Sequence, residues 1–316
     1  MAADSVGGAP SLVARALARA AECVDETTES VATASAPLAG EVVHDVRLTY
    51  KRLHALCSLV GPASERAAAT REPPCDGAPA EARGDARRAD ERMRDIHRAR
   101  SRARPRDVLP EGARDIGARA PQRLSAPLAE LGAFARGGAG VVAPSRGEVL
   151  GALAAARDAL ARDLVAARAV PARQLDRAVV DVLEASYRRV RRAARRARRS
   201  GRARDFHRWR RRLKAFLYQW EALGLDAMRT GAPVEGWRDL AARLGERQDL
   251  DDLRALLARA PLAPDDAESI DRRVRRRERA LERRALALAR ETLAREPRRF
   301  ARRLRRRLRR RLRRAT

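Results

Sequence analysis

The sequence predicts an all-α protein, and three features of its composition and pattern support that prediction. Ala and Arg are abundant and runs of β-branched residues are few, which favours helices. Apolar residues recur with a period close to 3.6 residues along most of the chain. Hydrophobic residues make up 45% of the sequence but aromatic residues only 3%, so the core must consist mainly of Leu, Ala and Val. The 316 residues suffice for one large helical domain or two smaller ones.

Turn residues divide the first part of the chain into helical segments. These are expected at about 11–24, 41–60 and 81–104, with shorter helices punctuated by Pro105, Pro110 and Pro121. Gly61 and Pro62 follow the second segment and are typical of a helix end. The glycine-rich stretch at 137–146 is the expected linker between two halves of the chain.

The second part of the chain repeats this order of helices. They are expected at about 147–167, 171–199, between Asp205 and Gly224, and at 237–244, 250–260 and 265–295. Pro171 suits the first position of its helix. Asp205 is expected to cap the N-terminus of the helix that follows. Both halves are therefore expected to form helical hairpins that stack into bundles.

The last residues, 298–316, differ from the rest of the chain, because twelve of these 19 residues are Arg and none is acidic. Leu304, Leu308 and Leu312 follow Phe300 at intervals of four residues and form a narrow apolar stripe. Since neighbouring arginines repel one another, we expect this tail to be frayed or disordered until it binds an anion. Such a tail can bind nucleic acid non-specifically through counterion release.

Two of the expected helices carry the same basic pattern, His-x-x-Arg-x-x-x-Lys. It reads His44, Arg47 and Lys51 in the first copy and His207, Arg210 and Lys214 in the second. At about 100° per residue the three positions lie within roughly 60° of arc, so the cations share one helix face. They span about 10 Å along the axis, which suits a row of phosphates better than a single one. The chain has 68 arginines and only two lysines, and both lysines lie in this pattern.

Apolar residues occupy the opposite face of each motif helix. They are Val42, Val46, Tyr50, Leu53, Cys57 and Val60 in the first helix, and Phe206, Trp209, Leu213, Phe216, Trp220 and Leu223 in the second. A solvated basic face is the simplest explanation of one such helix. Its duplication, with a matching apolar back, favours two half-domains that hold one polyanion between them.

The net charge of +28 predicts a polyanionic partner. The tail contributes +12 of this charge and the body the remaining +16. Between Arg188 and Arg212 the chain has fourteen arginines and one acid, Asp205. Polyphosphate and nucleic acid are the two candidate partners. For the body, polyphosphate is favoured, because aromatic residues on an apolar helix face cannot stack on bases; for the tail, both partners stay open.

The cysteines and the hydropathy pattern indicate a cellular compartment. Cys23, Cys57 and Cys75 are odd in number and form no C-x-x-C pattern, so free thiols in a reducing environment are expected. No apolar run reaches 18 residues, and the N-terminus lacks a basic stretch followed by an apolar one. A cytoplasmic location without membrane insertion is therefore expected.

The motifs of phosphate-transfer enzymes are not found in the sequence. A P-loop needs Gly directly before its Lys, and neither Lys51 nor Lys214 follows a Gly. Asp107 and Asp249 are more typical of caps or of partners for Arg than of metal ligands. His44 has no upstream histidine, which a metal-dependent phosphohydrolase would need. We therefore expect no catalysis, no cofactor and no metal, and keep a phosphate-chain hydrolase with an unrecognised site as an alternative.

The paired motifs resemble the CHAD domain (conserved histidine α-helical domain), whose halves begin with a helix of the form V-H-x-x-R-x-x-x-[RK]-R-L-R or L-H-x-x-R-x-x-x-K-x-x-R-Y-x-x-E. The matching residues are Val43, His44, Arg47, Lys51, Arg52 and Leu53, and then His207, Arg210, Lys214, Tyr218 and Glu221. Arg106-Asp107-Val108 and residues 244–249 are similar to two further family segments, R-D-x-x-V and L-G-x-x-x-D. The chain departs from the family at His54 and Leu217, where the family has Arg.

The resemblance covers about residues 10–295, with halves at about 10–136 and 147–295, and leaves out the tail. It implies two pseudo-symmetric four-helix bundles around a basic central groove, and non-catalytic binding of inorganic polyphosphate with an association with polyphosphate granules. The binding residues that it implies are His44, Arg47, Lys51, Arg52, His207, Arg210, Arg211 and Lys214. His54, Arg106, Tyr218 and Arg243 are expected to contribute less, and Asp107, Glu221 and Asp249 to orient the others. The alternative is a histone-like protein that binds nucleic acid mainly through the tail.

Overall fold

The computed structural model describes residues 10–35, 38, 40–68, 122–137, 145–226 and 232–315, and every regular element within these ranges is a helix. In chain order they are α1 (Leu12–Thr33), α2 (Gly40–Ala68), the short 3-10 helix η1 (Gln122–Leu124), α5 (Ser125–Gly137), α6 (Arg146–Arg168), α7 (Ala172–Ser200), α8 (Ala203–Ala222), α9 (Val234–Leu257), α10 (Pro264–Thr292) and α11 (Pro297–Ala315). The predicted all-α fold is confirmed. The helix expected at 81–104, together with Cys75, Arg106 and Asp107, lies outside the described residues.

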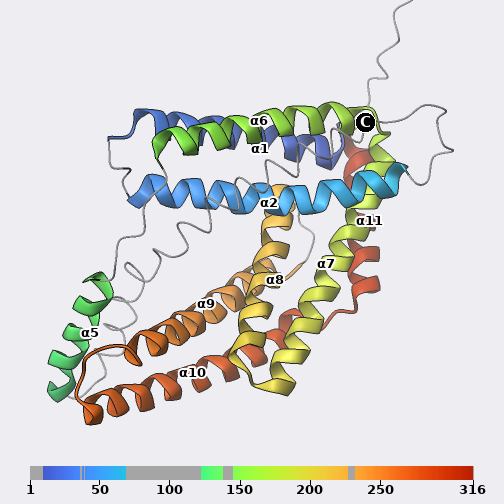
Figure 1. Ribbon diagram of the computed structural model, residues 1–316. Coiled ribbons are helices and arrows are strands. Elements are labelled where there is room, and N and C mark those ends of the chain that lie inside the picture. Colours follow the sequence, from blue (N-terminus) through green and yellow to red (C-terminus); the bar gives the residue numbers. More distant parts are fainter. Residues whose placement is uncertain are drawn as a thin grey trace, which may run out of the picture.

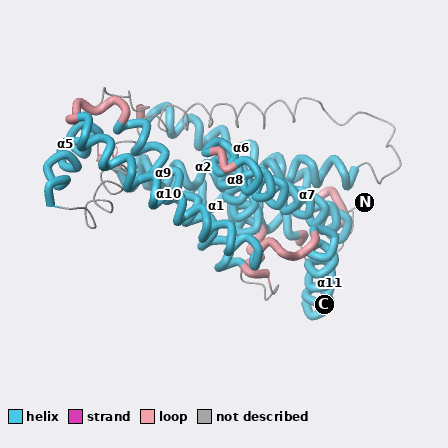
Figure 2. The backbone as a smooth tube through the Cα atoms, turned by 90° about the horizontal axis from the view of Figure 1, so that it is seen from below, coloured by secondary structure: helices cyan, strands magenta, loops and turns pink. Residues whose placement is uncertain are grey.

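The helices form two connected groups (Figure 1). In the first group α1, α2 and α6 lie side by side, and α7, α8 and α11 run away from them. In the second group α9 and α10 run side by side and lead to η1 and α5. A second view places α5 and α11 at opposite ends of the molecule (Figure 2). The fold is therefore elongated, with the motif helices α2 and α8 near its middle.

A large hydrophobic core lies between the helices of the first group and parts of α9 and α10, and α8 contributes its whole apolar face to it. The tryptophans Trp209, Trp220 and Trp237 are fully buried there. The ring of Phe216 meets that of Trp237 edge-on, with centroids 5.0 Å apart. Because its aromatic side is turned inward, α8 presents its His, Arg and Lys residues on the outer side, as the sequence predicts.

Helices from both expected halves share this core. α1 packs against α6, and α2 packs against α7 and α8. The carboxylate of Asp176 on α7 accepts a hydrogen bond of 2.8 Å from the backbone N–H of Leu12, and so caps the start of α1. The first and second halves are therefore interleaved in the described ranges, and the division into two pseudo-symmetric bundles stays a prediction.

A smaller hydrophobic cluster fills the far end of the molecule, where η1 and α5 contact the α9–α10 hairpin. Its fully buried members are Leu124, Leu131, Leu253, Ile270 and Val274. This cluster holds together the turn between α9 and α10. It lies away from the motif residues of α2 and α8 and contributes to the fold only.

The helix end expected at Gly61 and Pro62 is wrong, because α2 continues through both residues to Ala68. Ala63 and Ala67 beyond the proline are buried in the core, at 0% and 2% exposure. Gln174 of α7 also donates a hydrogen bond of 2.6 Å to the carbonyl of Ala67. Burial of this last turn outweighs the hydrogen bond that a proline removes from a helix.

Three details of the second half also differ from the sequence predictions. The two helices expected at 237–244 and 250–260 are one helix, α9. Pro171 is the residue before α7, at its N-cap, and not the first helical residue. Asp205 does not cap α8, because Arg202 holds that position; Asp205 lies buried in the first turn and accepts a hydrogen bond of 2.8 Å from the Nε of Arg196.

The expectation of a frayed tail is also wrong, because 297–315 form the helix α11, which packs against α7. Phe300, Ala301, Leu304 and Leu308 are buried in the large core. The ring of Phe300 stacks on that of Tyr187, with centroids 4.5 Å apart. The apolar stripe of the tail is therefore a core-forming face, and its burial offsets the repulsion among the arginines.

Candidate functional site

The two motif helices are in contact with each other, where α2 lies against the C-terminal part of α8. Gln219 of α8 donates a hydrogen bond of 2.9 Å to the Oγ of Ser58 on α2. The charge of Arg52 on α2 acts on both Tyr218 and Glu221 of α8. Two segments more than 150 residues apart in sequence thus bring one arginine of each copy, Arg52 and Arg210, near the same side chain, Tyr218.

In the first copy of the motif, His44 and Arg52 are exposed, and Arg47 and Lys51 are partly buried. His54, which stands where the family has Arg, is exposed, and its ring stacks on Tyr50 with centroids 6.0 Å apart.

In the second copy, His207, Arg210, Lys214 and Tyr218 are partly buried and Arg211 is exposed. The Nε atoms of Arg210 and of its counterpart Arg47 are both buried. In both copies the arginine is thus partly buried, with its Nε atom inside the protein.

Gly245 of α9 explains how the guanidinium of Arg210 is placed. A Cβ atom at this position would lie 3.7 Å from the Nε and 3.8 Å from an Nη of Arg210. The guanidinium therefore lies directly over the glycine, and a side chain longer than that of Ala would compete for its space. The L-G-x-x-x-D segment and the second motif, which the sequence shows separately, meet at this contact.

His207 is held by a pair of polar residues that the sequence does not single out. Its Nδ1 lies 2.6 Å from the Oε1 of Gln248, and the amide of Gln248 donates 2.9 Å to the Oδ1 of Asp252. A carboxylate only accepts hydrogen bonds, so the amide N–H2 of Gln248 faces Asp252 and its oxygen faces His207. Nδ1 of His207 is then the donor, and this hydrogen bond fixes the orientation of the ring.

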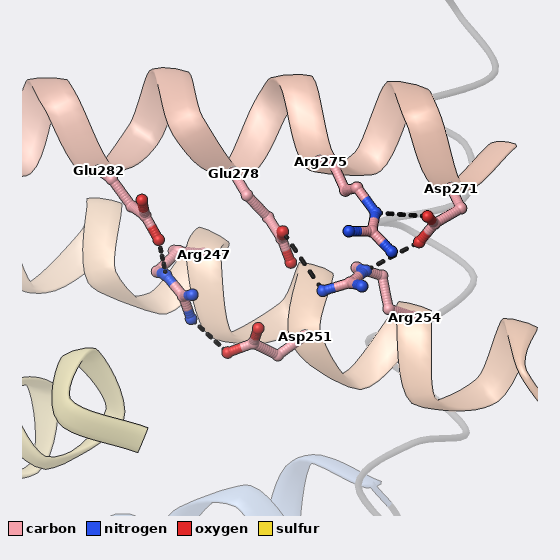
Figure 3. Close-up of polar contacts among 7 residues, drawn as sticks. All are labelled: Arg247, Asp251, Arg254, Asp271, Arg275, Glu278 and Glu282. Carbon is pink, nitrogen blue, oxygen red and sulfur yellow. Dashed lines mark hydrogen bonds and ion pairs between the residues drawn. The ribbon is translucent and has the colours of Figure 1, made fainter. Parts of the chain in front are cut away.

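A buried arginine, Arg247, fixes α9 beside this contact. It is 4% exposed, and its guanidinium lies 4.9 Å from the ring centroid of Phe206 on α8. It pairs with Asp251 of its own helix, and its Nε lies 2.9 Å from Glu282 of α10 (Figure 3). Because these contacts tie α8, α9 and α10 together, the neighbouring Gln248 is kept in register with His207.

Helices α9 and α10 carry a second group of ion pairs, nearer the turn that joins them (Figure 3). Arg254 of α9 lies 2.8 Å from Asp271 and 3.7 Å from Glu278 of α10. The hydrogen bond to Asp271 raises the pKa of Arg254, and burial raises the pKa of the Glu278 carboxyl. These residues connect α9 to α10 and lie outside the expected site.

Glu221 and Arg243, two other residues of the expected site, are held by neighbouring charges. Glu221 lies 3.7 Å from Arg238, and burial raises the pKa of its carboxyl while Arg238 and Arg52 act to lower it. Arg243 lies 3.0 Å from Glu246, which also binds Arg277 at 3.2 Å. Asp249 is partly buried on α9.

An additional cationic cluster lies on another side of α8. Burial and the nearby charges of Arg212, Arg66 and Arg192 lower the pKa of Arg189 on α7. Arg212 lies about 200° around α8 from Arg210, so this cluster faces away from the motif row. Within the described part of the chain, no acidic side chain pairs with Arg66, Arg189 or Arg212.

Neither a metal site nor a membrane-spanning helix is found among the described residues. No group of three or more His, Cys, Asp or Glu side chains in this part of the chain could hold a metal ion. No helix there is both long and apolar enough to cross a membrane. Cys23 and Cys57 form no disulfide bond with each other.

Comparison with known proteins identifies the family. No curated protein and no solved structure matches the chain. The family model of the CHAD domain matches residues 77–258, which is more than half of the chain. The matched segment includes α8 and all of α9, with His207, Arg210, Lys214 and the 244–249 segment, and it begins after α2. The chain therefore belongs to the CHAD domain family.

Proposed function

We propose that this protein binds inorganic polyphosphate without catalysis. The binding residues are the basic residues of both motif helices, which we call the motif surface: His44, Arg47, Lys51, Arg52, His207, Arg210, Arg211 and Lys214. The observation that carries the proposal is the contact between α2 and α8, which supports one continuous surface built from two equivalent helices. Membership of a family associated with polyphosphate binding supports the same ligand.

The chemistry of these side chains suits a chain of phosphates. Arg donates two parallel hydrogen bonds to phosphate oxygens, and Lys adds a compact charge. The Nδ1 atom of His207 is held by Gln248, so Nε2 is the ring nitrogen left to contact a phosphate. It can donate a hydrogen bond there only when the ring is charged. Each copy spans about 10 Å, so two copies in contact can follow several successive phosphates of one flexible chain.

Burial of the aromatic residues of α8 disfavours single-stranded nucleic acid as the ligand of this surface. Phe206, Trp209, Phe216 and Trp220 all lie in the core and cannot stack on bases. A histone-like nucleic-acid binder and a phosphate-chain hydrolase are the alternatives. A cytoplasmic location near polyphosphate granules is part of the proposal.

A binding measurement tests this function. The triple variant His207→Ala, Arg210→Ala and Lys214→Ala should bind long-chain polyphosphate at least about tenfold more weakly than the wild type, since each charged hydrogen bond contributes roughly 1.5–3 kcal/mol. A control with Arg276→Ala and Arg283→Ala removes the same two formal charges, with His counted as neutral, from exposed positions of α10. Equal losses in both variants would reject the motif surface. Release of orthophosphate by the wild type, absent in the triple variant, would favour the hydrolase.

A further inference from the structure

α11 presents a row of arginines on the outside of the molecule that the motif surface does not include. Its exposed arginines are Arg298, Arg299, Arg302, Arg303, Arg306, Arg309 and Arg310. At about 100° per residue they cover roughly 140° of arc, opposite the buried stripe of Phe300 and Leu304. Among the described residues, no acidic side chain forms an ion pair with any of the seven. One face of α11 thus lies in the core, and the opposite face consists of arginines.

The cationic face of α11 continues onto α7. Glu296 accepts a hydrogen bond of 2.9 Å from Arg191, and the charges of Arg195 and Arg299 also act on its carboxyl. The hydrogen bond from Arg191 and these charges lower the pKa of Glu296. One carboxylate therefore lies beside Arg195 of α7 and Arg299 of α11, so the two helices join their arginines at this point.

The direction of the two helices makes the joined surface long. α11 begins beside Arg191 and runs toward the N-terminal part of α7, where Arg305 pairs with Asp181. On α7, the exposed Arg195, Arg198 and Arg199 extend the row the other way. At 1.5 Å per residue the combined row, which we call the arginine ridge, is about 30 Å long.

We propose that the arginine ridge is a docking surface for duplex nucleic acid and contacts its phosphates without reading its sequence. A rigid row of about 30 Å matches the length of roughly nine base pairs at 3.4 Å each. Guanidinium groups bind phosphate oxygens in pairs of hydrogen bonds. The ridge uses residues other than those of the motif surface, so the two binding sites are independent.

Two other polyanions suit the ridge less well. Single-stranded nucleic acid needs aromatic platforms, but Phe300 and Tyr187 are buried and stacked on each other. An amphipathic helix binds a membrane by inserting its apolar face, and that face of α11 lies in the protein core. Duplex phosphates need only an exposed, fixed row of cations.

The test uses the full chain and a fluorescent 20-base-pair duplex of random sequence at several salt concentrations. The ridge variant Arg299→Gln, Arg302→Gln, Arg303→Gln and Arg306→Gln should bind the duplex at least about tenfold more weakly. Its slope of log affinity against log salt should be shallower by about 3 to 4, since each lost phosphate contact contributes roughly 0.9. The matched control is Arg276→Gln, Arg279→Gln, Arg283→Gln and Arg284→Gln on α10, which removes the same charge at exposed positions and should keep the slope.

A second ridge variant, Arg298→Gln, Arg309→Gln and Arg310→Gln, tests the same surface through other side chains and should also lose affinity for the duplex. Equal loss in the α10 control, or unchanged duplex binding in both ridge variants, would overturn the proposal. So would a larger loss on anionic lipid vesicles than on the duplex. Polyphosphate binding should persist in the ridge variants, and duplex binding should persist when Arg210 is replaced by Ala, so failure of one site is distinguishable from failure of the other.

Discussion

Replacement of Phe300 by Ala should destabilise the whole protein, because α11 is part of the core. Phe300 is 4% exposed, and its ring lies 4.5 Å from that of Tyr187 and between 6.1 and 6.3 Å from those of Phe216, Trp220 and Trp237. Truncation of a buried Phe to Ala costs about 3–5 kcal/mol. Stacked aromatic pairs add roughly 0.5–1.5 kcal/mol beyond the buried area, which favours the upper part of that range.

The measurement is urea unfolding followed by circular dichroism, together with thermal melting. We expect a loss of about 4 kcal/mol in the free energy of unfolding and a Tm lower by roughly 6 °C for a chain of this size. Leu304→Ala, one turn further along, should cost about 2–5 kcal/mol. The matched control is Arg303→Ala, an exposed position on the same helix, which should change stability by less than about 0.5 kcal/mol.

A free energy of unfolding for Phe300→Ala within about 1 kcal/mol of the wild type would refute this reasoning. Hydrogen exchange gives a second check, because the backbone amides of a docked α11 are protected from exchange, whereas those of a frayed tail are not. Rapid exchange of the amides throughout 300–308 would show that this segment is not docked on the core. Any binding of nucleic acid would then depend on flexible arginines.

Three further predictions concern the residues around the motif surface. Gln248→Leu removes the acceptor of the His207 Nδ1–H and so frees the ring to turn. Polyphosphate affinity should fall about two- to tenfold, and an unchanged affinity would contradict a positioning role for Gln248. Arg247→Leu leaves two carboxylates without their guanidinium and should cost about 3–5 kcal/mol in urea unfolding at pH 7, and a cost below about 1 kcal/mol would be inconsistent with a buried pair. Burial raises the pKa of Glu278 above its value in the unfolded chain, so the charged form of Glu278 disfavours folding. Glu278→Gln should therefore raise the Tm at pH 7 and leave it unchanged below about pH 4. A lower Tm at pH 7 would show that the pairing of Glu278 with Arg254 dominates.

Features that depend on helical periodicity could be predicted from the sequence. The apolar face of α8 is buried as expected, because residues such as Trp209 and Phe216 recur at helical spacing over five turns. The placement of Arg210 and Lys214 on the other face follows from the same periodicity. The family, too, could be identified from the sequence, and the family model matches the part of the chain that carries the second motif and the 244–249 segment.

Features that depend on tertiary contacts could not be predicted in this way. Pro62 is a stop signal in isolation, but the alanines beyond it find a buried place that only the packed helices create. The apolar stripe of α11 looks too narrow to fold alone, and its partner Tyr187 lies more than 100 residues away. The contact of Gly245 with Arg210 and the hydrogen bond of Gln248 to His207 likewise join α9 to α8 across a distance that no sequence pattern encodes.

The central claim is that α2 and α8 supply one polyphosphate-binding surface. Isothermal titration of the wild type, Arg47→Ala, Arg210→Ala and the double variant, each with short and long polyphosphate chains, tests this claim most directly. One surface predicts that each single variant loses about tenfold or more in affinity for chains long enough to reach both helices, and less for short chains that contact only one copy. Equal losses at every chain length, or a loss from only one of the two arginines, would contradict it.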